Sequence, residues 1–159
     1  MKVYCLDTGV LVEPWTKYYS MGKCPDYWEL IDRLAKEGAI FCTEEVLREI
    51  EKVDDELKEW VQKHPHLFRK INGPVQLHVR SILERFPEMM NPIKGRSTAD
   101  PWVVAHALAD EAIVVTTEGP APKKIKIPDV CNAFNVKWMD DHKFVDEIGI
   151  RFSASFKRK

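Results

Sequence analysis

Short apolar runs, each accompanied by an acidic residue, constrain the fold of this chain more than any other feature. The runs begin at Val3, Ala39, Pro101 and Ala112, and the acids beside them are Asp7, Glu49, Asp100 and Glu118. Bounded runs of four or five apolar residues are typical of buried strands in a parallel sheet. Such a sheet gathers its strand ends, and the helices that follow them, around one crevice. The sequence therefore predicts that these acids meet at one end of a parallel sheet.

The segments between the predicted strands have mostly helical spacing. Strands are expected at residues 2–6, 39–42, 112–116 and 136–139, with a loop from residue 7 to residue 24. A helix over 25–37 places its apolar residues on one face and ends at Gly38, and extra helices fall between the second and third strands. This alternation predicts an α/β fold, a three-layer α/β/α sandwich with a small central parallel sheet. We expect one domain over residues 1–152 and a basic C-terminal tail over 153–159.

Composition limits the function classes that remain. The 159 residues include 24 Lys and Arg against 25 Asp and Glu, so a nucleic acid would have to be bound by a local basic patch. No run approaches the roughly 20 apolar residues that span a bilayer, so we expect a cytoplasmic protein without a membrane segment. The four cysteines lack the spacing of a zinc site.

Carboxylates brought together from distant parts of a chain repel one another and resist desolvation unless a cation neutralises them. An all-oxygen cluster of this kind suits Mg²⁺ or Mn²⁺. Three of the four acids also have an ordinary structural interpretation. Asp100 before Pro101 has the position of a helix N-cap, Glu49 has Glu45 as a rival one turn earlier, and Glu118 alone is a loop charge.

Four segments together resemble the PIN-domain nucleases, small VapC-like toxin ribonucleases or an uncharacterised PIN-like branch. Val3–Thr8 resembles the family's first strand with its aspartate, and 43–50 is similar to its second motif, which contains a glutamate. Ala99–Ala107 resembles the third motif, and 115–118 the fourth. Order and spacing agree across all four, which is more specific than any single motif. Two positions depart from the pattern: Gly9 replaces a usual Asn or Ser, and Glu118 replaces a usual Asp.

The resemblance implies a metal-dependent endoribonuclease that hydrolyses RNA, in many small relatives as the toxin of a toxin–antitoxin pair. It assigns Asp7, Glu49, Asp100 and Glu118 as catalytic residues and ligands of Mg²⁺ or Mn²⁺, supported by Thr8 and Thr116. Two interpretations of Asp129 are open: a supporting acid at the crevice, or the N-terminal residue of a short helix. We expect the RNA backbone to be held by loop cations. These are Lys94, Arg96, Lys123, Lys124 and Lys126. An antitoxin protein and a homodimer are open as partners. The alternative is a catalytically inert PIN-like module that binds nucleic acid or protein.

Overall fold

The computed structural model describes residues 1–90, 98–119 and 123–158 and contains a central five-stranded sheet. The strands are β1 (Tyr4–Leu6), β2 (Ile40–Thr43), β3 (Phe68–Arg69), β4 (Ile113–Thr116) and β5 (Trp138–Asp140). Their order in the sheet is β3-β2-β1-β4-β5, and every neighbouring pair is parallel. The predicted parallel sheet is confirmed, and β3 is a strand that the sequence patterns did not indicate.

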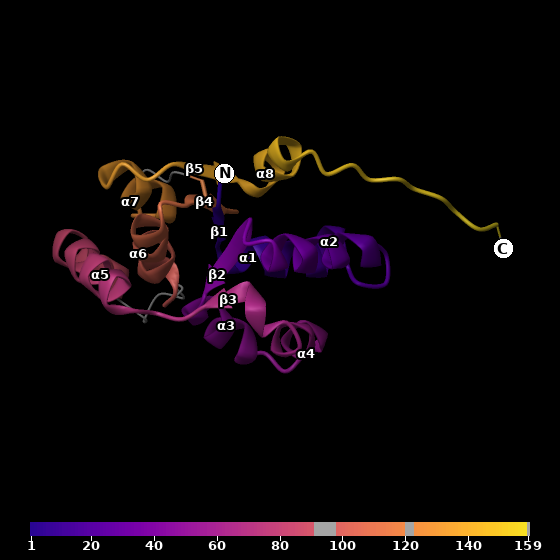
Figure 1. The fold of residues 1–159 in the computed structure, drawn as a ribbon, viewed down its shortest axis with the longest axis horizontal. Helices are drawn as coiled ribbons and strands as arrows, with labels where there is room; N and C mark the ends of the chain where they lie inside the picture. Colours follow the sequence, from indigo (N-terminus) through magenta and orange to yellow (C-terminus); the bar gives the residue numbers. More distant parts are fainter. Residues whose placement is uncertain (91–97, 120–122, 159) are drawn as a thin grey trace.

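The helices cover both faces of the sheet and fill the connections between strands. They are α1 (Thr8–Glu13), α2 (Pro25–Lys36), α3 (Glu44–Glu51), α4 (Glu56–Gln62), α5 (Gly73–Arg85), α6 (Asp100–Asp110), α7 (Ile127–Ala133) and α8 (Asp141–Ile148), with the short helices η1 (Pro14–Tyr18), η2 (Pro65–Leu67) and η3 (Pro87–Met90). Figure 1 places α5, α6 and α7 on one side of the strands and α1, α2 and α8 on the other. The predicted three-layer α/β/α arrangement is therefore confirmed. The extra helices expected between the second and third predicted strands, which are β2 and β4, are α3, α4, α5 and α6.

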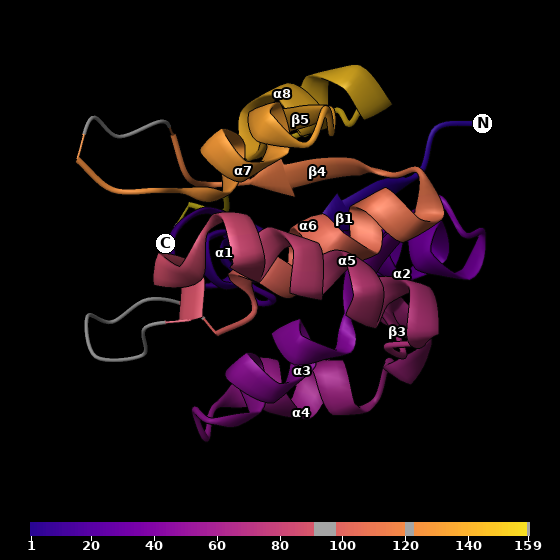
Figure 2. The same ribbon diagram turned by 90° about the vertical axis from the view of Figure 1, so that its left-hand side faces the viewer.

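The two strands β1 and β2 are buried on both faces of the sheet. All three residues of β1 and all four of β2 are buried, which matches continuous apolar runs rather than alternation. Helix α6 packs against β1, β2 and β4, and α5 packs across α6 (Figure 2). Helix α6 thus lies directly over the centre of the sheet, which places its first residue close to the strand ends.

The first connection differs from the expected loop. Residues 8–18 form α1 and the π-helix η1, and Val10 and Leu11 of α1 are buried in the core. Asp7 is the N-cap of α1. Helix α2 matches its prediction closely, because Gly38 follows its end with a φ of 75°, a left-handed conformation that glycine adopts without strain.

The last residues of the described chain extend away from the helices (Figure 1), and residues 153–158 are exposed. Across the three described ranges, every helix is too short or too polar to span a lipid bilayer.

Candidate metal centre at the carboxyl end of the sheet

Asp7 is fixed by the pairing of β1 with β4. Leu6 pairs with Val115, and the backbone N–H of Asp7 continues the ladder by donating to the Val115 carbonyl at 2.9 Å. The carboxylate then turns inward: Oδ1 accepts from the Thr8 N–H at 2.7 Å and Oδ2 accepts from the Thr116 hydroxyl at 3.0 Å. Only 4% of Asp7 is exposed. The predicted supporting residue Thr116 therefore contacts Asp7 directly.

Asp100 reaches the same place from α6. It is the first residue of that helix and is buried, while Ala99 occupies the N-cap position. The expectation that Asp100 caps the helix is therefore wrong. Pro101 lies at the start of α6, as predicted. Because the N-cap position belongs to another residue, helix capping does not account for the burial of the Asp100 carboxylate.

Glu118 lies two residues after β4, and both its backbone and its side chain are hydrogen-bonded. Its backbone N–H donates to the Thr116 hydroxyl at 3.1 Å, and its Oε2 accepts from the Ile127 N–H at 3.1 Å. Ile127 is the first residue of α7. One Thr116 hydroxyl thus joins Asp7 to the Glu118 backbone, and the start of α7 holds one oxygen of the Glu118 side chain.

The structure brings Asp7, Asp100 and Glu118 together, with one carboxylate oxygen of each within 4.8 Å of the others. Burial, followed by the negative charge of Glu118 and, to a smaller extent, that of Glu49, raises the pKa of Asp7 from 3.8 to about 7. A divalent cation would offset this repulsion. Three carboxylates, two of them buried, supply the oxygen donors that Mg²⁺ and Mn²⁺ prefer, so the residues present fit such an ion.

Glu49, the fourth predicted ligand, lies beside this group rather than within it, among the residues that the structure describes. Its Oε2 accepts from the Thr8 hydroxyl at 2.7 Å, and its Oε1 accepts from the Ala99 N–H at 2.9 Å and the Thr98 hydroxyl at 3.4 Å. The side chain therefore connects α3 to the start of α1 and to the residue before Asp100. This bracing contact was not evident from sequence, because it depends on three distant segments meeting.

Asp129 supports the site indirectly. Its Oδ2 accepts from the Lys126 N–H at 2.8 Å, which closes the first turn of α7. That turn presents the Ile127 N–H to Glu118. Of the two interpretations open at the sequence level, the geometry places Asp129 at the helix start. It is linked to the clustered acids only through the first turn of α7, whose Ile127 N–H donates to Glu118.

The predicted loop cations are placed only in part. Lys123 and Lys124 are exposed and Lys126 is half-buried, all between β4 and α7. Lys94 and Arg96 lie outside the described residues.

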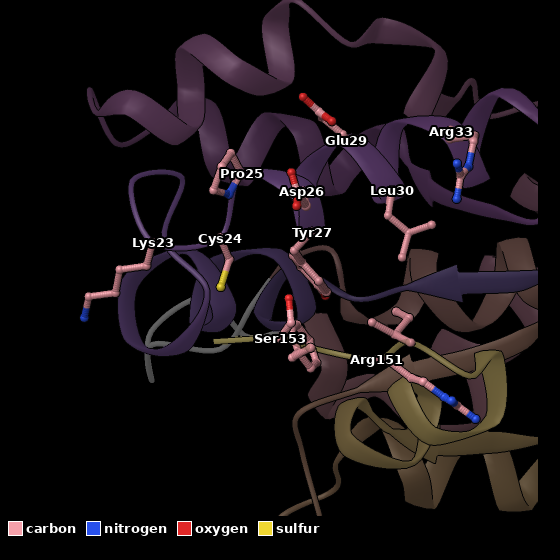
Figure 3. Close-up of a pocket in the computed structure, with 12 residues that line it drawn as sticks. Lys23, Cys24, Pro25, Asp26, Tyr27, Glu29, Leu30, Arg33, Arg151 and Ser153 are labelled. Carbon is pink, nitrogen blue, oxygen red and sulfur yellow. The ribbon is translucent and has the colours of Figure 1, made fainter. Parts of the chain in front are cut away.

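A separate pocket of about 400 Å³ lies between α2 and the segment after α8. Figure 3 shows Tyr27 and Leu30 of α2 facing Arg151 and Ser153 across it. None of the clustered acids lines this pocket, so the pocket and the acid cluster are separate places on the described chain.

The five-stranded parallel sheet of this chain, flanked by helices on both faces, matches the PIN-like fold. Three solved structures share it, each with a TM-score of 0.53: VapBC2 from Rickettsia felis bound to a promoter DNA fragment, VapBC-1 from nontypeable Haemophilus influenzae, and FitAcB from Neisseria gonorrhoeae. In that order, they are 18%, 14% and 15% identical in sequence to this chain. The matches cover 87%, 88% and 88% of this chain, and 98%, 98% and 99% of the respective similar chains. At such identities the likeness establishes the fold alone.

The family itself is defined by a sequence model that matches residues 4–152. The chain belongs to this family, which is described as a domain of unknown function (DUF4411). No curated protein matches the chain.

Proposed function

We propose that the protein is a divalent-metal-dependent endoribonuclease and the toxin of a toxin–antitoxin pair. The observation that carries the proposal is the convergence of Asp7, Asp100 and Glu118 within 4.8 Å at the carboxyl end of a PIN-like sheet. Two of the similar structures are of VapBC proteins, and one of these is bound to a promoter DNA fragment. The shared fold, the acid cluster of this chain and the resemblance of its four motifs to those of PIN-domain nucleases together support the proposal.

In this proposal Asp7, Asp100 and Glu118 hold Mg²⁺ or Mn²⁺. When bound, such an ion lowers the pKa of water and neutralises charge on a phosphodiester undergoing in-line attack. Thr116 fixes the orientation of Asp7, and Thr8 joins Asp7 to Glu49. These supporting hydrogen bonds set the direction of the ligand oxygens before an ion arrives.

Lys123, Lys124 and Lys126 are proposed to hold the RNA backbone, together with Lys94 and Arg96. The first two are exposed on the connection that follows Glu118, so they lie close in sequence to the acid cluster. Because the net charge is −1, binding depends on this local group of cations and should weaken as salt rises.

The test is cleavage of labelled single-stranded RNA by purified protein, with Mn²⁺ or Mg²⁺ added and with EDTA as the control. Asp100→Asn should abolish metal-dependent cleavage, because the amide keeps the shape of the side chain but lacks its charge. A matched variant is Asp54→Asn, which removes an acid whose side chain is 98% exposed, and it should cut like the parent. Equal cutting by the Asp100→Asn variant and the parent would refute the nuclease assignment.

The second candidate is an inert PIN-like binding module, a hypothesis that arose from the Gly9 and Glu118 departures. Glu118 still brings an oxygen to within 4.8 Å of Asp7 and Asp100, so the longer side chain does not remove a ligand. Loss of Asp7 should leave the partners of an inert module unchanged. An antitoxin encoded beside this gene should, in contrast, bind the protein and suppress its cleavage of RNA.

A further inference from the structure

Gly9 makes the closest approach of any glycine in the described chain. A Cβ added to Gly9 would lie 2.3 Å from the Thr117 hydroxyl oxygen and 3.4 Å from both the Cβ and the Cγ2 of Thr117. The other glycines of the described ranges would meet nothing within 4 Å. Gly9 has no positive φ, so its backbone conformation does not require glycine. The reason for glycine in the first turn of α1 is therefore the Thr117 side chain.

The two residues in contact belong to the two segments that carry Asp7 and Glu118. Gly9 is two residues after Asp7, and Thr117 lies between Thr116 and Glu118. Thr116 donates to Asp7, while Glu118 is one of the three clustered acids. The contact thus fixes how far the segment after β4 stands from the first turn of α1, and with it the separation of Glu118 from Asp7.

We propose that Thr117 is a positioning residue whose packing against Gly9 sets the geometry of the metal centre. The inference rests on the proposed function, since it assigns to Thr117 a role in the same site. Glycine is disfavoured in helices relative to alanine, so its presence in α1 is consistent with a steric demand from the site.

The Thr117 Cα–Cβ bond has three staggered side-chain positions. One position faces Gly9 and holds the hydroxyl oxygen at the 2.3 Å approach. Of the two other staggered rotamers, one puts the methyl group there and only one puts hydrogen there. An alanine at position 9 therefore forces Thr117 into that one rotamer or displaces the segment 116–118. In a Thr117→Ala background the hydroxyl and methyl groups are gone, and the Thr117 Cβ lies at an ordinary van der Waals distance of 3.4 Å from the added Cβ.

The experiment is a double-mutant cycle with Mn²⁺ affinity and melting temperature as readouts. Calorimetric Mn²⁺ titrations and melting curves in EDTA are recorded for the parent, Gly9→Ala, Thr117→Ala and the double variant. Gly73→Ala is the matched control, because Gly73 begins α5 and a Cβ there meets open space. Gly9→Ala should lower Mn²⁺ affinity about 10–100-fold, the usual effect of losing support for a ligand. Gly73→Ala should not change it.

The double variant should recover the affinity of Thr117→Ala alone, because the added Cβ then has room. If the two substitutions acted independently, their losses of Mn²⁺ affinity would add, and the double variant would bind Mn²⁺ more weakly than either single variant. A parent that binds Mn²⁺ while Gly9→Ala binds it equally well overturns the inference and leaves the proposed function in place. A double variant no better than Gly9→Ala also overturns it, and so does a double variant that fails to fold when Gly9→Ala fails. A parent that does not bind Mn²⁺ overturns the proposed function and the inference together.

Discussion

Replacing Asp7 with Asn should stabilise the metal-free protein while removing its response to metal. Asp7 is 4% exposed, and its pKa rises from 3.8 to about 7 because of burial and the charges of Glu118 and Glu49. A carboxylate whose ionised form is disfavoured in the folded state lowers the free energy of unfolding at neutral pH. Asn keeps the size of the side chain and caps a helix about as well as Asp does.

The magnitude follows from the pKa. At about 1.4 kcal/mol for each pH unit, the ionised Asp7 costs the metal-free fold about 4 kcal/mol above pH 7. Asn must still accept from the Thr8 N–H, and its amide group must replace a carboxylate oxygen opposite the Thr116 hydroxyl. Rearranging one such hydrogen bond costs about 1 kcal/mol. The expected net gain is roughly 3 kcal/mol, or roughly 6–12 °C in melting temperature for a domain of this size.

The direction of the Asp7 pKa shift also determines how the stability of the protein depends on pH. Between pH 3.8 and about pH 7 the folded state binds the Asp7 proton that the unfolded state releases, so the parent loses stability as pH rises through this window. The Asn variant has no such group. The difference in free energy of unfolding between the variant and the parent should therefore be small near pH 4 and reach its full value above pH 7.

The assay is urea unfolding of both proteins in EDTA at several pH values between 4 and 8, followed by melting curves with Mn²⁺ at pH 7.5. At about 100 times its dissociation constant Mn²⁺ should add about 2.7 kcal/mol to the parent and far less to the variant. The reasoning is refuted if the variant is no more stable than the parent at pH 8 in EDTA. Equal stabilisation of both proteins by Mn²⁺ would refute the metal centre.

Two further predictions concern the supports of the ligands. Asp129→Ala and Asp140→Ala each remove a carboxylate that accepts an N–H at the start of a helix, so each should cost about 0.5–2 kcal/mol of stability. Only the Asp129 variant should also weaken Mn²⁺ binding, as measured by titration, because only α7 holds Glu118; equal affinity in both variants would contradict this. Glu49→Gln replaces one carboxylate oxygen with an NH₂ group, so the side chain can accept from only one of the Thr8 hydroxyl and the Ala99 N–H, and should destabilise the protein by about 1–3 kcal/mol. Denaturant unfolding in EDTA measures this loss, and unchanged stability would argue against the bracing role.

The sheet was predictable from sequence because its longer strands are buried on both faces. Continuous apolar runs at Ile40–Thr43 and Ile113–Thr116 leave little choice of structure once Gly38 ends the preceding helix. β3 was missed because it has only two residues, both half-buried. Helix α1 was missed because it contains glycine and two valines, which are poor helix formers, and depends on Asp7 as its cap and on burial of Val10 and Leu11.

The candidate site was predictable as a set of acids but not as a geometry. Asp7 and Glu118 follow adjacent strands, so their approach is a consequence of strand order that sequence patterns capture. The distinction between Asp100 and Ala99 at the start of α6 depends on a turn of the backbone that a capping rule does not resolve. The Gly9–Thr117 contact involves residues 108 positions apart, and the only sequence signal for it was the unusual glycine.

Glu49 was predicted to be a metal ligand, and in the structure it has two separate effects on the acid cluster, one through hydrogen bonds and one through its charge. Its oxygens accept from Thr8 and Ala99, so its position is set by bracing. Its charge nevertheless raises the pKa of Asp7. Each carboxylate oxygen has two lone pairs, so these hydrogen bonds do not cancel the negative charge that Asp7 experiences. Three carboxylates therefore bring oxygens together at this centre, and the negative charge of a fourth, Glu49, also acts on it. That excess of negative charge over nearby ligand atoms favours a divalent cation over a monovalent one.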